Sequence, residues 1–385
     1  MMKNFIIKVL KKMFPSVLYS HFRNTLLSMY YFIPKIRIAR KKIELDHSLE
    51  PKLSYACLVP KKNEIVCGGK VKLIRLAKEF PEQNNKFNIL YLVSSALPRH
   101  LTEWISICKD KGVKIVLNQN GVYYGGWYGE GWEAGNQPLR QALLSADFVI
   151  YQSEFSKLGA DKFLGKPAAG FSVIYNAVDT LFFTPDNKEK QKTLTILLGG
   201  NQYQYYRLEA AARAVSYIKT QVPDVRLLIT GRLNWLNNQH ETGKIATALF
   251  KGLNIENNVR ILGPYLQKDA PDIYRQAHIF LHTKYNDPCP TTVIEAMACG
   301  LPVVYSKSGG VAELVDESCG AGINAELSWE KDVYPDPKLL AEAVMIIAEK
   351  RNKFSEAARE RAVRNFDVRT WLREHNSVFQ KVLRK

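Results

Sequence analysis

The order in which short apolar runs and amphipathic helical patterns follow one another restricts the fold of this chain most. From Leu53 onward, runs rich in β-branched residues alternate with helical patterns, which is typical of parallel α/β units. The first half contains five strand candidates, namely SYACLVP, FNILYLVS, VKIVLNQ, FVIYQS and FSVIYN. The second half adds LTILLGG, VRLLITG, VRILGPY, HIFLHT and PVVYS. The chain is therefore predicted to form parallel sheets covered by helices.

A polar stretch divides the two series of strands. Residues 184–193, TPDNKEKQKT, show neither the apolar run of a strand nor the amphipathic pattern of a helix, and they are interpreted as a linker. Because 385 residues exceed the usual size of one hydrophobic core, two domains are expected. We predict Rossmann-like domains at 51–185 and 190–366, a basic amphipathic extension at 1–50, and a C-terminal helix at 367–385 that packs back toward the first domain. The cleft that the two domains face is the expected site.

Basic residues dominate the charge of the chain. It carries 54 Lys and Arg against 37 Asp and Glu, a net charge of +17. Such a field attracts phosphate-rich partners, which include nucleic acid, anionic lipid headgroups and sugar nucleotides. Ten of the basic residues, but only three of the acidic ones, lie in residues 1–50. The excess charge is therefore concentrated in the predicted extension.

The opening segment, MMKNFIIKVLKKMF, has the pattern of an amphipathic helix. Phe5, Ile6, Val9, Leu10 and Met13 fall on one face, and lysines surround the rest. Two interpretations stay open: the helix lies on an anionic membrane surface, or it packs its apolar face on the protein itself. Lysines interrupt the apolar runs of this segment, so no secretory signal is predicted. The best remaining apolar run, Leu26 to Ile33, is too short to span a membrane and ends at Pro34, so no transmembrane helix is predicted. We expect a cytoplasmic protein, peripheral to the inner face of the membrane under the first interpretation.

Neither the cysteines nor the histidines have the spacing of a metal site. The six cysteines include no CxxC pair and lie in apolar stretches, as expected for free thiols in a reducing cytosol. The histidines are scattered, and His278 and His282 fall in or beside one strand candidate. No Asp-x-Asp tripeptide occurs. We therefore predict no metal and no cofactor.

Residues 286–315, NDPCPTTVIEAMACGLPVVYSKSGGVAELV, carry the most informative pattern. Asp287 and Glu295 lie on either side of a Pro-rich turn and a helix start. Thr291 or Thr292 can cap this helix, so that its positive end faces the cleft and binds phosphate or sugar hydroxyls. Glu295, one turn further, can accept hydrogen bonds from a ribose diol. By spacing alone, however, two such acids are more often simply solvated.

Small residues form two further turns of interest. Ser308, Gly309 and Gly310 precede a helix and allow backbone amides to approach phosphate closely. Gly68 and Gly69 stand in the same way before the first helix of the first half. A Gly-Gly pair by itself is a turn more often than a site.

The segment 286–315 resembles the donor-binding motif of the retaining GT-B glycosyltransferases of family 4, the type that acts in bacterial cell-surface polysaccharide synthesis. The resemblance implies that Glu295 holds the donor ribose and that Asp287, where the family usually has Glu, contacts the transferred sugar. It implies that the amides of Gly309 and Gly310 lie near the diphosphate. It also implies that Gly68 and its neighbour Gly69 form the family's glycine-rich loop, close to the donor phosphates and the acceptor.

Two departures from the family pattern change the expected chemistry. The turn at 199–207, GGNQYQYYR, lacks the family's Arg after Gly200, so Arg207 is assigned to the diphosphate; the alternative is a surface arginine at a helix start. Asn120 stands where the family commonly has His near the reacting carbon. Asn can hydrogen-bond but cannot take a proton at neutral pH, which excludes an enzymic base there. A retaining mechanism tolerates this, because the leaving diphosphate can accept the proton.

The sequence therefore predicts a glycosyltransferase that moves a hexose-type sugar from a nucleotide sugar to a glycan or lipid-linked acceptor with retention. A UDP-sugar is favoured over a GDP-sugar, and no specific nucleic acid is expected as a partner. Two alternatives remain. One is a sugar-nucleotide epimerase of similar fold, and the other is a non-enzymatic basic protein that binds membrane or nucleic acid. A dinucleotide oxidoreductase is disfavoured because no GxGxxG occurs.

Deletion of residues 1–48 is expected to release the protein from anionic liposomes, because each basic residue near the headgroups contributes about 1 kcal/mol of attraction. Sedimentation with liposomes at increasing salt measures the effect, which should fade as the attraction is screened. Donor binding should survive, since the motif residues lie beyond the cut. A truncated chain that still sediments would support the helix that packs on the protein itself.

Overall fold

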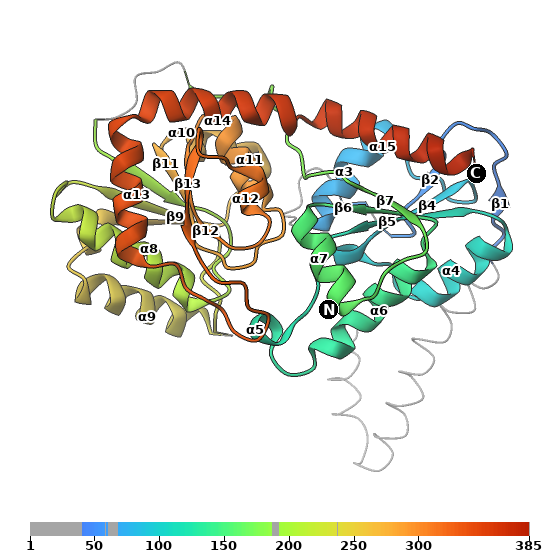
Figure 1. Cartoon of the computed structure of the whole chain (residues 1–385), viewed down its shortest axis with the longest axis horizontal. Coiled ribbons are helices and arrows are strands. Elements are labelled where there is room, and N and C mark those ends of the chain that lie inside the picture. The colour runs from blue at the N-terminus through green and yellow to red at the C-terminus, as the bar shows by residue number, and fades with distance from the viewer. Residues whose placement is uncertain (1–40, 58, 61–67, 187–191, 237, 385) are drawn as a thin grey trace, which may run out of the picture.

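A computed structural model describes residues 41–57, 59–60, 68–186, 192–236 and 238–384. Two parallel β-sheets covered by helices form the two halves of the molecule (Figure 1). The predicted α/β fold with two Rossmann-like halves is thus confirmed. The amphipathic helix predicted at residues 1–14 lies outside the described residues, as do 187–191 of the predicted linker.

The first sheet has the strand order β2-β4-β5-β6-β7, and every pair in it is parallel. Its strands are β2 (Leu53–Ser54), β4 (Ile89–Val93), β5 (Lys114–Gln119), β6 (Phe148–Tyr151) and β7 (Gly170–Val173). The helices of this half are α3 (Gly69–Glu79), α4 (Leu101–Asp110), α5 (Gly125–Tyr128), α6 (Trp132–Ser145) and α7 (Glu154–Phe163). The candidate SYACLVP shares only Ser54 with the short β2, while the other four candidates each supply a strand.

The second sheet has the order β10-β9-β8-β11-β12-β13 and is also parallel. Its strands are β8 (Thr195–Leu198), β9 (Arg226–Thr230), β10 (Val259–Gly263), β11 (Ile279–His282), β12 (Val303–Lys307) and β13 (Gly320–Asn324). The helices are α8 (Tyr205–Lys219), α9 (Gln239–Gly252), α10 (Ala270–Arg275), α11 (Thr291–Ala298), α12 (Val311–Leu314), α13 (Pro337–Glu349) and α14 (Arg351–Asn365). The five predicted strands are present, and β13 is additional.

The end of the predicted basic extension belongs to the first half of the structure. Strand β1 (Glu44–Leu45) pairs in parallel with β3 (Lys86–Phe87), and Ile43 is buried in the core that includes Phe87. A deletion to residue 48 would remove this strand and expose apolar surface. The liposome experiment is therefore better performed with a deletion that ends at residue 40.

The C-terminal helix α15 (Val368–Leu383) returns to the first half of the molecule (Figure 1). Its side chains Trp371, Val378 and Phe379 are buried in the cluster that contains Tyr91 of β4. Asp367 begins the helix by accepting the N–H of Arg369 at 2.9 Å. The preceding helix α14 packs on α11 of the second half. The end of the chain thus spans both sheets.

Several contacts connect the halves across the space between the sheets, and two side chains of the second half, Glu313 and Trp329, supply a large share of them. The carboxylate of Glu313, on α12, accepts the N–H groups of Glu154 and Phe155 at 2.8 and 2.9 Å, in the first turn of α7. Trp329, which follows β13, stacks on Phe155 with ring centroids 5.3 Å apart and meets Tyr124 edge-on at 4.9 Å. These contacts hold the two halves of the molecule in one arrangement.

Candidate functional site

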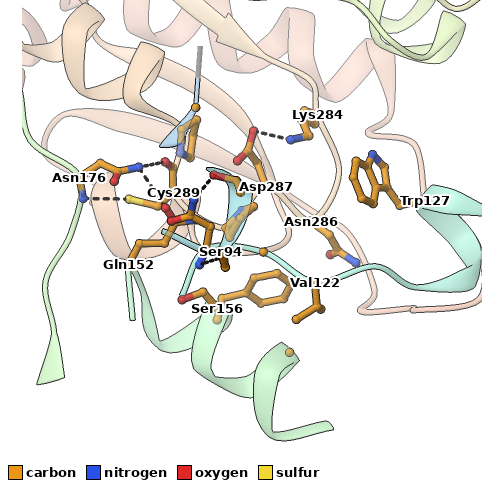
Figure 2. A pocket seen from close by; sticks show the side chains of 18 of the residues that line it. Ser94, Val122, Trp127, Gln152, Ser156, Asn176, Lys284, Asn286, Asp287 and Cys289 are labelled. Carbon is orange, nitrogen blue, oxygen red and sulfur yellow. Dashed lines mark hydrogen bonds and ion pairs between the residues drawn. The ribbon is translucent and has the colours of Figure 1, made fainter. Parts of the chain in front are cut away.

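The strand order of the second sheet determines where a site can lie. The chain winds outward from β8 to β10 and then returns to the other side of β8 at β11, so β8 and β11 flank a topological switch point. Ligands of such sheets bind outside the carboxyl ends of the strands at this point. A cavity of about 400 Å³ lies there, lined by residues that follow β11 and by residues of the first half (Figure 2).

The cavity brings together part of the predicted site. The predicted residues that line it are Gly68, Asn120, Asp287, Thr291 and Thr292, and those outside its lining are Gly69, Gly200, Arg207, Glu295, Ser308, Gly309 and Gly310. The two walls of the predicted cleft therefore both contribute.

Asp287 is a buried, ionised carboxylate in the cavity wall. It follows β11 and lies 3.0 Å from the Lys284 ammonium and 3.4 Å from Nε2 of His282 (Figure 2 shows the Lys284 pair). Burial by itself would raise the pKa of Asp287, but Lys284 and His282 outweigh burial and hold the pKa well below its usual range. The site thus presents a fixed negative charge beside a lysine.

The turn at 308–310 supports the loop that carries Asp287. The hydroxyl of Ser308 accepts the N–H of Asn286 at 3.0 Å, and the N–H of Gly310 donates to the Asp287 carbonyl at 2.9 Å. Gly309 has φ +71° and packs on the same loop. The amide of Gly310, which was expected to bind phosphate, is therefore occupied by Asp287, and the turn acts on the site through this loop.

The start of α11 differs from the prediction. Neither Thr291 nor Thr292 caps the helix, because Pro290 occupies the N-cap position and makes no side-chain capping bond. Both threonines lie in the first turn and line the cavity. The N–H groups of this turn have no side-chain cap, so the positive end of α11 faces the cavity and favours an anion there.

Glu295 lies one turn along α11, behind the cavity lining. It is only 4% exposed, and its two oxygens accept from Nε2 of Gln267 at 2.6 Å and from the hydroxyl of Tyr274 at 2.9 Å. Burial raises the pKa of Glu295, while the Gln267 bond and the Arg75 charge oppose this rise. Each oxygen keeps a second lone pair, which a ribose diol can use.

The first half contributes a lysine in an amide cage. Lys72, on α3, is buried, and its ammonium donates to the side-chain oxygens of Asn118, Asn120 and Gln152 at 2.7, 2.6 and 3.0 Å. Burial lowers the pKa of Lys72 to about 7. Asn120, which the sequence placed at the reacting centre, is thus held in position by this ammonium.

Arg207 lies beneath the site instead of in the cavity. Its side chain is 4% exposed, so the alternative of a surface arginine is wrong. One guanidinium nitrogen donates to the carbonyl of Asn201 at 2.5 Å. The charges of Arg207 and Asp287 influence one another without a direct bond between the two side chains. Gly200 forms a close backbone contact with Gly231, whose Cβ position would lie 2.4 Å from the Gly200 oxygen.

Aromatic side chains form the remaining wall of the cavity. Tyr123, Tyr124 and Trp127 come from the loop after β5, and Phe155 and Trp329 complete the wall. Tyr124 is almost fully buried, whereas Trp127 is 42% exposed at the rim. Tyr124 thus belongs to the core, whereas Trp127, on α5, presents exposed surface at the rim.

The described residues contain no group of three or more His, Cys, Asp or Glu side chains arranged to hold a metal ion. Within the same residues, no helix is long and apolar enough to cross a membrane. Five cysteines are described, and all five are free thiols.

Several residues of the site were not identified from the sequence. Among them are Lys72, His282, Lys284 and Trp329. A signal existed for two of them: Lys72 occurs on the buried face of its helix, next to Leu73 and Leu76, and Lys284 lies just beyond the strand end that precedes Asp287. No local pattern indicated Trp329, which reaches the site from a loop after β13.

Solved structures with a similar arrangement define the fold. The Anabaena protein HepE, crystallised in complex with UDP, matches with a TM-score of 0.63 and 19% identity over 81% of each chain. A glycosyltransferase from Rickettsia africae matches with a TM-score of 0.61 and 18% identity, covering 83% of this chain and 84% of that one. The fold is therefore that of the GT-B glycosyltransferases, as the sequence predicted.

Sequence comparisons find similar glycosyltransferases over part of the chain. Residues 180–361 match the family described as glycosyl transferases group 1. A human phosphatidylinositol N-acetylglucosaminyltransferase subunit is 28% identical over 183 residues, 48% of this chain and 36% of that protein. N-acetyl-alpha-D-glucosaminyl L-malate synthase of Bacillus anthracis is 22% identical over 261 residues, 65% of this chain and 63% of that protein. The chain thus spans less than two thirds of these relatives. The similarity to the group 1 glycosyltransferase family thus extends over residues 180–361, just under half of the chain.

Gly310→Ala is expected to lower the free energy of unfolding by about 1–3 kcal/mol, because forced overpacking displaces backbone. The added Cβ would lie 2.0 Å from the carbonyl oxygen of Pro288. Chemical denaturation measures the change. The matched control is Gly243→Ala in α9, where nothing lies within 4 Å of the new Cβ, so stability should rise slightly. Equal stability of Gly310→Ala and the unmodified chain would contradict the packing described here.

Proposed function

We propose that this chain is a glycosyltransferase that moves a hexose-type sugar from a nucleoside-diphosphate sugar to an acceptor with retention of configuration. The observation that carries the proposal is the cavity at the switch point, where Asp287 and the uncapped start of α11 meet Asn120 of the first half. An anion-binding helix end, a fixed carboxylate and an amide side chain suit a diphosphate and a sugar ring. The match of residues 180–361 to the group 1 glycosyl transferases supports the same activity.

The proposed roles follow the order of groups along α11. Glu295 binds the ribose, the first turn with Thr291 and Thr292 faces the diphosphate, and Asp287 contacts hydroxyls of the transferred sugar. Asn120 orients the reacting sugar by hydrogen bonds. Asn120 cannot take a proton at neutral pH, so the leaving diphosphate is proposed to take the acceptor's proton.

The acceptor is proposed to be a glycan or a lipid-linked glycan, within surface polysaccharide synthesis. The names of the relatives include a phosphatidylinositol glycosyltransferase, which supports an acceptor at a membrane. The aromatic wall with Trp127 at its rim offers stacking surfaces for sugar rings. We propose a cytoplasmic location, with residues 1–40 attaching the protein to the anionic inner face of the membrane. UDP is the proposed nucleotide, and the reaction is proposed to need no metal.

A thermal-shift panel of UDP-, GDP- and ADP-sugars in EDTA tests the donor. A sugar nucleotide at a hundred times its dissociation constant should add about 2.7 kcal/mol of stability. Incubation with glycan and lipid-linked acceptors, followed by NMR of the product's anomeric proton, tests transfer and retention. Stabilisation by none of the sugar nucleotides would refute the proposal. An isomerised sugar formed without acceptor would indicate an epimerase, and activity that returns only with added magnesium would refute the metal-free reaction.

Two substitutions separate the proposed roles of the acids. Glu295→Gln should weaken binding of the free nucleoside by about 10- to 100-fold, because a charged acceptor bonded to two hydroxyls is lost. Asp287→Asn should keep nucleoside and nucleoside diphosphate affinity while lowering turnover, because its partner is the transferred sugar. Isothermal titration and initial rates measure both effects. The assignment of roles is wrong if Asp287→Asn weakens the free nucleoside as strongly as Glu295→Gln does.

A further inference from the structure

The cavity wall contains a buried cation that no carboxylate balances. The three bonds of the Lys72 ammonium all go to neutral amide oxygens, those of Asn118, Asn120 and Gln152. A charged ammonium has three donors, so this cage satisfies its hydrogen bonds but not its charge. Desolvating a charge without a counter-ion is costly. Because Lys72 lines the cavity, a bound ligand can supply the missing negative charge.

Of the other two cations considered for the diphosphate, one is paired with a carboxylate and one lies outside the cavity lining. Lys284 also lines the cavity, but its ammonium lies 3.0 Å from Asp287. Arg207, to which the sequence assigned the diphosphate, lies outside the lining and donates to the backbone of Asn201. Among the described residues that line the cavity, Lys72 is thus the basic side chain without a carboxylate partner.

The position of Lys72 relative to α11 indicates which part of a nucleotide sugar it would meet. Lys72 and Arg75 lie one turn apart on α3. The charge of Arg75 acts on Glu295 of α11. The charge of Lys72 acts on Cys289, which lies just before α11. Along the axes of α3 and α11, the position of Glu295 and Arg75 is where the ribose is proposed to bind. One turn, about 5 Å, toward the start of both helices lie Lys72 on one side and Thr291 and Thr292 on the other. This is the level that the diphosphate must cross to bring the sugar to Asp287.

We propose that Lys72, from the first half, binds the diphosphate of the nucleotide sugar and stabilises the charge of the leaving group. The inference rests on the proposed function and deepens it. The longest of the three cage bonds, to Gln152 at 3.0 Å, is exchanged for a phosphate oxygen. Gln152 then keeps a partner, because its oxygen also accepts from Nδ2 of Asn176 at 3.3 Å. The uncapped amides of α11 contact the diphosphate from the opposite side.

This geometry links donor binding to pH. Burial lowers the pKa of Lys72 to about 7, the nearby Arg75 lowers it too, and the thiol of Cys289 is the group that opposes this. The cage amides do not titrate, and Asp287 stays ionised throughout. Binding of a diphosphate favours the charged ammonium, so above pH 7 the protein must take up a proton to bind. Affinity should therefore fall by roughly tenfold for each pH unit above 7.

The first test compares Lys72→Met with Lys70→Met, an exposed lysine on the same helix that serves as the matched control. The probes are UDP-glucose and uridine, or GDP-mannose and guanosine if the donor panel selects guanine, titrated calorimetrically without acceptor. Lys72→Met should weaken the nucleotide sugar by about 10- to 100-fold and the nucleoside by less than about threefold. Lys70→Met should leave both unchanged. Unchanged nucleoside affinity also shows that the Lys72→Met chain is folded.

The second test needs no variant to fold. Titration of the unmodified chain with the nucleotide sugar from pH 7 to pH 9 should show the predicted loss, since a diphosphate diester does not titrate in this range. Lys72→Met should bind with little dependence on pH, and Lys72→Arg should restore affinity at pH 9, because a guanidinium stays charged.

Three outcomes would overturn either this inference about Lys72 or the proposed function. Equal nucleotide-sugar affinity of Lys72→Met and the unmodified chain would overturn the inference and leave the proposed function intact. Equal losses for nucleoside and nucleotide sugar would give Lys72 a structural role and would overturn it as well. An unmodified chain that binds no nucleotide sugar would refute the proposed function itself.

Discussion

The carboxylate of Glu313 holds the two walls of the cavity together, and the geometry of the site depends on this contact. It accepts two N–H groups at the positive end of α7, at 2.8 and 2.9 Å, where a negative charge is most favourable. The same segment, three residues earlier, supports the Asp287 loop through the N–H of Gly310. One short stretch thus fixes the acid of the second half and the helix of the first. The distance between Asp287 and the Lys72 cage follows from it.

The fold and the central acid could be predicted because their signals are local. Strand and helix periodicity determines the parallel α/β units, and a Pro-rich turn followed by VIEAMA determines the start of α11 to within a residue. The capping prediction failed because Pro290 took the N-cap position that Thr291 or Thr292 was expected to hold. Strand β13 was missed because Gly320 and Gly322 have low strand propensity, and it forms through its pairing with β12.

The rest of the site could not be predicted because it depends on contacts between distant segments. Lys72 and Asn120 are 48 positions apart in the chain, and Glu313 and Glu154 are 159 apart. A lysine on an amphipathic helix is usually solvated, and only the fold places Lys72 against three amide side chains. Arg207 is the opposite case, a residue that the sequence placed in the site and the structure places outside its lining. Its position in the glycine turn suggested a phosphate ligand, but packing buries the guanidinium below the site, where it influences Asp287 by charge alone.

The contacts that join the two halves also affect how a ligand reaches the cavity. Trp329 stacks on Phe155, its carbonyl accepts the N–H of Gly126 at 2.8 Å, and Glu313 caps α7 nearby. All three contacts join the second half to the first, so a rigid separation of the halves would break them together. A nucleotide sugar bound by Glu295 on one wall and Lys72 on the other would add further bonds across the same gap. Donor binding and closure would then stabilise one another, because each favours the same separation of the two walls.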